Sequence, residues 1–247
     1  MKKIKNKIFG QGKPKVCVSL LFDETYKEQL KQLEEKKFDV LECRIDYFQD
    51  LYDVDTLCHR LQEIYRSLEG PLLLVTFRSL KEGGQQELEG ERYIALYQRI
   101  LESHCLDLID IEFTRGPMLV KTVLKMANDY GIFTILSYHD FEKTRISLAL
   151  FEQMAIFKPD FIKIACMPKS QEDVVSLLLK THRMHQKVTP CLITMSMGES
   201  GKISRVTGEI FGSCMTFGFV QKNSAPGQID LDHLHIYLDC IHQAIDE

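Results

Sequence analysis

The most informative segment of the sequence about the fold is Val40-Leu-Glu-Cys-Arg-Ile-Asp-Tyr47. Apolar residues alternate along it with the charged residues Glu42, Arg44 and Asp46. A period of two is the period of a β-strand, and it places the charged set and the apolar set on opposite faces. We therefore predict a strand at this position with one charged face and one apolar face.

Seven other short runs, rich in apolar and β-branched residues, resemble this one, and stretches of helical periodicity separate them. The eight candidate strands are Val16–Phe22, Val40–Tyr47, Leu72–Arg78, Leu108–Phe113, Phe133–His139, Phe161–Met167, Cys191–Met197 and Cys214–Val220. Eight strand–helix units without a linker predict an α/β fold, a (β/α)8 TIM barrel formed by a single domain over residues 1–247. A doubly wound open sheet remains the structural alternative.

Local signals refine this prediction at the ends of the elements. Thr25-x-x-Glu28 and Ser170-x-x-Asp173 resemble capping boxes, so we expect helices to begin there. Before the first strand, Ile4–Phe9 and the turn signal Gly10-Gln-Gly12 predict a short N-terminal β-hairpin.

Composition and charge restrict the class of protein. Apolar residues make up 45% and charged residues 27% of the 247 residues, as in ordinary globular proteins. The net charge of −4 argues against a nucleic-acid partner, and no apolar run is long enough to span a membrane. The basic start Met1–Gly10 lacks the apolar run of a secretory signal, so we expect a cytoplasmic protein with reduced cysteines. The eight cysteines lack metal-ligand spacing, so no metal site is expected.

Charged residues recur at the carboxyl ends of several predicted strands, where barrels of this class keep their active sites. Besides the set in Val40–Tyr47, they include Arg78, Asp110, Glu112 and Lys163. Charges inside a barrel are unfavourable unless they are paired or functional. A buried ion-pair network that only stabilises the barrel is the alternative for any single residue, but the clustering favours an active site.

Lys163 is the strongest catalytic candidate, because it alternates with the apolar Ile162 and Ile164 and so faces the polar interior. Burial disfavours the charged form of an amine and favours the nucleophilic form that makes a Schiff base. His139 ends the preceding strand and is a candidate general acid and base, although a lone histidine at a strand end can also serve a loop.

Three loops complete the candidate site. Glu82, in the loop after the third strand, could reach His139 and orient it. Arg205 follows the seventh strand and could bind a carboxylate through two hydrogen bonds, a solvated surface arginine being the alternative. The segment Ser224–Gln228 is small and flexible enough in sequence to act as a lid.

Taken in order along the chain, these motifs resemble those of type I 3-dehydroquinate dehydratases. The matching segments are Glu42-Cys-Arg-Ile-Asp46, Thr76-Phe-Arg78, Glu82-Gly-Gly84, Ser137-Tyr-His-Asp-Phe141, Lys163-Ile-Ala165, Met195-Ser-Met-Gly198, Arg205 and Ser224-Ala-Pro-Gly-Gln228. The resemblance implies a (β/α)8 fold, usually a homodimer, and conversion of 3-dehydroquinate to 3-dehydroshikimate in the shikimate pathway without a cofactor.

The resemblance also assigns roles to residues. It implies that Lys163 forms the imine with the substrate, that His139 moves the proton and that Glu82 is its partner. The residues implied to bind substrate are Ser19, Glu42, Arg44, Arg78, Arg205, Ser224 and Gln228.

Two other functions stay open at this stage. A class I aldolase also uses an inward barrel lysine, and a non-catalytic barrel could bind a polyol acid as a sensor. Retention of both Lys163 and His139 disfavours the sensor, since binding alone needs neither. The sequence does not distinguish aromatic biosynthesis from quinate breakdown.

Overall fold

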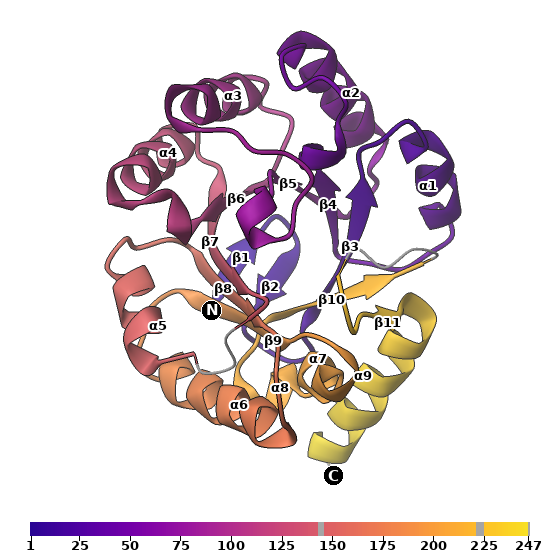
Figure 1. Cartoon of the computed structure of the whole chain (residues 1–247). Helices are drawn as coiled ribbons and strands as arrows, with labels where there is room; N and C mark the ends of the chain where they lie inside the picture. Colours follow the sequence, from indigo (N-terminus) through magenta and orange to yellow (C-terminus); the bar gives the residue numbers. More distant parts are fainter. Residues whose placement is uncertain (143–145, 221–224, 247) are drawn as a thin grey trace. The chain divides into compact units, whose positions relative to one another are not determined.

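The computed structural model describes residues 1–142, 146–220 and 225–246, and it divides the chain into two compact units. Unit 1 consists of Met1–Ser19 and Tyr138–Glu247, and unit 2 of Leu20–Ser137. The divisions fall inside two strands, β3 (Lys15–Leu21) and β7 (Phe133–Asp140). Figure 1 shows the elements of both units in sequence colours.

Unit 2 is built from parallel strands that alternate with helices. Its elements, besides parts of β3 and β7, are α1 (Tyr26–Leu33), β4 (Val40–Arg44), η1 (Ile45–Tyr47), α2 (Val54–Ser67), β5 (Leu72–Thr76), η2 (Leu80–Glu82), α3 (Gly90–Glu102), β6 (Leu108–Glu112), η3 (Phe113–Arg115) and α4 (Pro117–Asp129). Strands β4, β5, β6 and β7 pair in that order, each parallel to the next. Every residue of β4, β5 and β6 is buried, as expected for strands covered on both faces.

The helices of unit 2 bury one apolar stripe each. In α3, Tyr93, Leu96, Tyr97 and Ile100 recur at the helical spacing and are buried. The rings of Tyr93 and Tyr97 stack with centroids 4.3 Å apart, and α3 packs beside α4. The Tyr97 hydroxyl donates to the Asp110 carbonyl of β6 over 2.6 Å, and the Tyr93 ring lies edge-on to Phe77, just after β5, so this stripe forms a buried apolar wall against the ends of β5 and β6.

Unit 1 continues the alternation of strands and helices. Its elements, besides parts of β3 and β7, are β1 (Lys2–Ile4), β2 (Lys7–Phe9), α5 (Leu148–Ala155), β8 (Phe161–Cys166), α6 (Gln171–His185), β9 (Cys191–Ser196), η4 (Glu199–Gly201), α7 (Ile203–Val206), α8 (Gly208–Phe211), β10 (Met215–Phe219), β11 (Ile229–Asp230) and α9 (Leu231–Asp246). Strand β8 pairs with β9, and β10 pairs with both β3 and β11, all in parallel.

The strand order confirms the (β/α)8 class. Each of the eight strands β3 to β10 is followed by at least one helix, and the first of them pairs with the last. Strands β4 to β7 pair in sequential order, whereas the strand order of a doubly wound sheet reverses at a switch point. The alternative of a doubly wound open sheet is therefore wrong. The single domain over residues 1–247 stays a prediction. Among the described residues, no helix is both long enough and apolar enough to cross a bilayer.

The N-terminal hairpin is confirmed, but its predicted turn is wrong. Strands β1 and β2 pair antiparallel around Lys5 and Asn6, and Lys5 adopts a positive φ of 50°. The glycines Gly10 and Gly12 follow the hairpin instead of closing it. The ring of Phe9 packs edge-on against Phe161, with centroids 5.1 Å apart, which anchors the hairpin to β8.

One predicted capping box is confirmed and the other is wrong. The Ser170 hydroxyl accepts from the Asp173 amide and the Asp173 carboxylate accepts from the Ser170 amide, so both halves of that box are present. At α1, the Thr25 side chain makes no capping hydrogen bond, because its hydroxyl donates to Asp23 over 2.7 Å and accepts from the side-chain amide of Gln29 over 3.0 Å.

Candidate active site

The charged residues of unit 2 meet where its strands end. Glu42 of β4 accepts a hydrogen bond from the Thr76 hydroxyl of β5 over 3.0 Å. Thr76 lies opposite Asp110 in the parallel register, and Glu112 lies opposite Ser137. The predicted period-two alternation therefore brings polar side chains of neighbouring strands together.

Arg78, which follows β5, is the centre of this cluster and only 3% of it is exposed. Its guanidinium donates to Asp110 over 2.8 Å, to Glu112 over 3.2 Å and to Glu82 over 3.3 Å. It also donates to the Ser137 hydroxyl over 2.9 Å. Burial disfavours its charge, but the neighbouring carboxylates outweigh burial and raise the pKa of Arg78. Arg78 is thus a fully ionised cation held in a fixed position.

Arg44 forms a separate pair with Asp46. Its Nε and Nη2 donate to the two carboxylate oxygens, both over 2.8 Å, which is the bidentate geometry of arginine. Asp46 also accepts from the backbone amides of Arg78 and Gln85. These demands bend the chain into the 3-10 helix η1, so the predicted continuation of the strand to Tyr47 is wrong beyond Arg44.

Glu82 lies at the end of η2 and only 3% of it is exposed. It accepts from the Thr114 hydroxyl over 2.5 Å and from Arg78. Burial raises the pKa of Glu82 to about 7, against the lowering effect of Arg78. Two glycines make the tight turn after it: Gly83 has a φ of 85°, and a Cβ on Gly84 would lie 1.8 Å from the Arg78 carbonyl oxygen.

In unit 1, Lys163 lies in β8, opposite Ile193 of β9, and is 4% exposed. Its amino nitrogen lies 4.4 Å from the centroid of the Phe217 ring, which comes from β10. The ring provides an apolar wall and a favourable contact for a cation. Phe217 lies two residues after Met215 on β10, so period-two alternation places both side chains on the same face of the strand.

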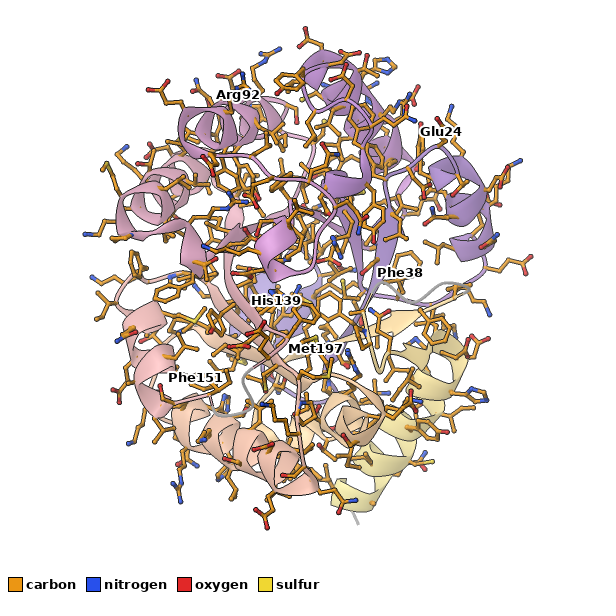
Figure 2. All side chains as sticks on the ribbon, in the orientation of Figure 1. Glu24, Phe38, Arg92, His139, Phe151 and Met197 are labelled. Atoms are coloured by element: carbon orange, nitrogen blue, oxygen red, sulfur yellow. The ribbon has the colours of Figure 1, made fainter. Side chains whose placement is uncertain are left out.

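His139 lies near the end of β7 and is half-buried (Figure 2). The backbone amide of Met167, just after β8, donates to the Asp140 carbonyl over 2.9 Å. This hydrogen bond joins the end of the His139 strand to the end of the Lys163 strand, so the predicted adjacency of the two strands is confirmed. The pairing of His139 with Glu82 joins residues of different units and stays a prediction.

Arg205 lies in the short helix α7 and is 2% exposed, so a solvated surface arginine is the wrong interpretation. Its Nη2 donates to the Pro226 carbonyl over 3.0 Å, and its Nη1 lies 3.6 Å from the Met195 sulfur. Its Nε is buried without a hydrogen-bond partner, and among the described residues no carboxylate pairs with it. Burial lowers the pKa of Arg205 to about 10.

The described part of the predicted lid, residues 225–228, packs against the turn after β9. The Gly198 amide donates to the Pro226 carbonyl, and a Cβ on Gly227 would lie 2.2 Å from the Gly198 carbonyl oxygen. Gln228 is 4% exposed. Ser224 lies outside the described residues. Ser19, near the end of β3, is half-buried.

The structure therefore groups the candidate residues into two sets, Glu42, Arg44, Arg78 and Glu82 in unit 2 and Ser19, His139, Lys163, Arg205 and Gln228 in unit 1. Sequence reasoning missed Thr114, Arg115 and Phe217, which contact members of these sets. Among the described residues, no group of three His, Cys, Asp or Glu side chains could hold a metal ion.

Comparisons with known proteins identify the family of the chain. The model of the family "Type I 3-dehydroquinase" matches residues 16–245. A 3-dehydroquinate dehydratase of Escherichia coli O17:K52:H18 is 39% identical over 247 residues, with 98% of each chain covered. Among solved structures, the type I enzyme of Clostridium difficile has a TM-score of 0.93 at 34% identity, with 98% of both chains covered. The 3-dehydroquinate dehydratase of Geobacillus kaustophilus has a TM-score of 0.92 at 30% identity, covering 98% of this chain and 96% of its own.

Proposed function

The chain belongs to the type I 3-dehydroquinase family, and from this premise we propose that it dehydrates 3-dehydroquinate through an imine on Lys163. The observation that carries the mechanism is the position of Lys163, a buried lysine on β8 against the Phe217 ring, beside the strand of His139. Family membership excludes the class I aldolase and disfavours a sensor.

The first step joins Lys163 to the substrate. The neutral amine attacks the ketone carbon, the carbonyl oxygen leaves as water, and an iminium remains. An iminium withdraws electrons more strongly than a ketone, so the hydrogen on the neighbouring carbon becomes more acidic. The crystal structure of the C. difficile relative was determined with covalently modified comenic acid. This supports covalent chemistry in the proposed mechanism.

His139 then moves the proton. As a general base it removes the hydrogen from the carbon between the iminium and the hydroxyl-bearing carbon, and an enamine forms. As a general acid it returns that proton to the hydroxyl, which leaves as water while the new double bond forms. Hydrolysis of the imine releases 3-dehydroshikimate and restores the amine of Lys163. Glu82, with a pKa near 7, suits the role of partner to this histidine.

Arg205 is the proposed partner of the substrate carboxylate. A buried guanidinium with no carboxylate partner among the described residues requires an anion from elsewhere to balance its charge. Its two hydrogen-bonding edges suit a planar carboxylate. Ser19, Glu42, Arg44, Arg78, Ser224 and Gln228 are proposed to bind the remaining polar groups of the substrate.

Borohydride trapping tests the mechanism. Borohydride added with 3-dehydroquinate should reduce the imine and inactivate the protein, and the adduct should map to Lys163 by mass spectrometry. Lys163→Ala should lose both labelling and formation of the ultraviolet-absorbing enone, whereas Lys169→Ala, which changes an exposed lysine just after β8, should keep both. An adduct on another lysine would contradict the proposal.

The cellular context is part of the same proposal. The reaction is the third step of the shikimate pathway, and we propose a cytoplasmic enzyme and a homodimer. Light scattering coupled to gel filtration measures the oligomeric mass directly. A monomeric mass at working concentration would contradict the dimer without affecting the proposed chemistry.

A further inference from the structure

Glu112, the last residue of β6, holds several groups of unit 2 at once and is fully buried. One carboxylate oxygen accepts from the Arg78 guanidinium over 3.2 Å and from the Ser79 amide over 2.8 Å. The other accepts from Nε of Arg115 over 2.9 Å. A single carboxylate therefore lies between two arginines and also holds a backbone amide.

Arg115 fixes the position of this carboxylate from behind. Its guanidinium carbon lies 4.6 Å from the Tyr93 ring centroid and 5.6 Å from that of Phe77. It also pairs with the half-exposed Glu87 over 2.9 Å. Because both rings belong to the buried apolar wall of unit 2, Arg115 and hence Glu112 have little freedom to move.

The Ser79 amide connects Glu112 to the turn that carries Glu82. The Ser79 carbonyl accepts from the Glu82 amide over 3.0 Å and from the Gly84 amide over 2.7 Å. Because both amides bind the same carbonyl, fixing the position of Ser79 also fixes the position of η2. Glu112 therefore fixes Arg78 directly, by accepting from its guanidinium. It fixes Glu82 indirectly, through the backbone of the turn that begins at Ser79.

The charge of Glu112 also affects Glu82, in addition to the hydrogen bonds that fix the turn. In unit 2, the groups that face Glu82 are Arg78 from the end of β5, Asp110 and Glu112 from β6 and the Thr114 hydroxyl from η3. Burial is the main reason that the pKa of Glu82 is raised, and the charge of Glu112 adds to it. Glu112 also shares the cation that would otherwise stabilise the Glu82 carboxylate alone.

We propose that Glu112 is a positioning residue for the dehydration, which fixes the Arg78 guanidinium and the turn that carries Glu82. Its part in turnover rests on the proposed function, whereas its effect on Glu82 does not. The role accounts for a buried carboxylate that the mechanism itself does not use.

The test follows the titration of Glu82 in the whole protein. Carboxyl-carbon NMR of glutamate-labelled protein gives its midpoint, with Glu82→Gln to assign the signal. Glu112→Gln keeps the shape of the side chain but removes the charge, so the Glu82 midpoint should fall by about one pH unit. The acid limb of kcat/KM should move to lower pH by a similar amount.

Arg115→Gln leaves Glu112 in place and should act oppositely. Without Arg115, Glu112 draws more strongly on Arg78, so the Glu82 midpoint should rise. Glu87→Gln is the matched control, because it also removes a carboxylate from Arg115 but lies outside the Arg78 cluster, and it should leave the midpoint unchanged.

If one of the two test variants, Glu112→Gln or Arg115→Gln, does not fold, the other still decides the question. An unchanged Glu82 midpoint in a folded Glu112→Gln or Arg115→Gln protein, or an equal shift in Glu87→Gln, would overturn the proposal. Shifted midpoints in a protein without dehydratase activity would support this electrostatic role while contradicting the proposed function.

Discussion

Replacing Arg205 by methionine should make the ligand-free protein more stable and at the same time remove most of its activity. Arg205 is 2% exposed, and among the described residues no carboxylate balances its charge. Methionine fills a similar volume without a charge, so the variant avoids burying an uncompensated cation. The same change removes the proposed partner of the substrate carboxylate.

The magnitude follows from the pKa of Arg205, which burial lowers from its ordinary value to about 10. Because each unit of pKa change corresponds to about 1.4 kcal/mol, a drop of this size means that the charged side chain destabilises the folded protein by about 3 kcal/mol. Loss of the hydrogen bond to the Pro226 carbonyl and of the contact with the Met195 sulfur opposes this gain by about 1 kcal/mol each. A net stabilisation of about 1 kcal/mol should raise Tm by roughly 2–4 °C in a chain of this size.

The pH dependence has a definite sign. Below pH 10 the arginine is charged in both the folded and the unfolded protein, so the full destabilisation is present. Above the folded pKa of about 10 and below the higher pKa of the unfolded chain, the unfolded chain binds the extra proton, and stability rises with pH. Arg205→Met should remove this rise, because no group then titrates at that position.

Calorimetry at neutral pH, with and without quinate as a carboxylate probe, measures the stability. Quinate should stabilise the parent protein but not Arg205→Met, and kcat/KM should fall roughly 30- to 4,000-fold, the range for truncating a buried charged contact. Arg183→Met, which changes an exposed arginine of α6, is the control and should alter neither. A less stable Arg205→Met protein that quinate still stabilises would refute the reasoning.

Two further changes test other parts of the site. His139→Ala should lower kcat by roughly 10²- to 10⁴-fold but should still form an adduct that borohydride traps. Near-normal steady-state turnover of this variant would show that another residue transfers the proton. Gly227→Ala should lower Tm and raise KM, because the added Cβ would lie 2.2 Å from the Gly198 carbonyl oxygen. Gly131→Ala is the control for backbone strain alone, because Gly131 has a similar positive φ and open space around it. Equal effects of the two substitutions on KM would exclude the steric explanation.

The sequence predicted the elements of this fold better than it predicted their ends. Strand β4 begins at Val40 as predicted, because alternation along a strand depends on neighbouring residues only. It ends at Arg44 because Asp46 is held by the amides of Arg78 and Gln85, which are distant in sequence. The same limit explains the Thr25 cap, where Asp23 takes the hydroxyl that the pattern assigned to the helix.

The candidate residues were predictable by type and position, but their partners were not. Parity placed Arg78 among acidic residues, yet which carboxylates it pairs with depends on the register of β5 and β6. For Arg205 the sequence predicted a loop residue that binds a carboxylate and left a solvated surface arginine as the alternative. The structure buries Arg205 in α7, because Pro226 and Met195 enclose it from other elements. A missing counter-charge can be recognised only once the surroundings are known.

The two buried arginines of the candidate site therefore differ in what they require. Arg78 is balanced within its own unit by Asp110, Glu112 and Glu82, so a ligand anion adds little to its stability and meets carboxylates that repel it. Arg205 has no such carboxylate among the described residues, so an incoming anion neutralises a charge that the fold alone leaves unbalanced. We therefore expect a larger gain in free energy when a carboxylate binds at Arg205, and this difference is the reason that we propose Arg205, and not Arg78, as the partner of the substrate carboxylate.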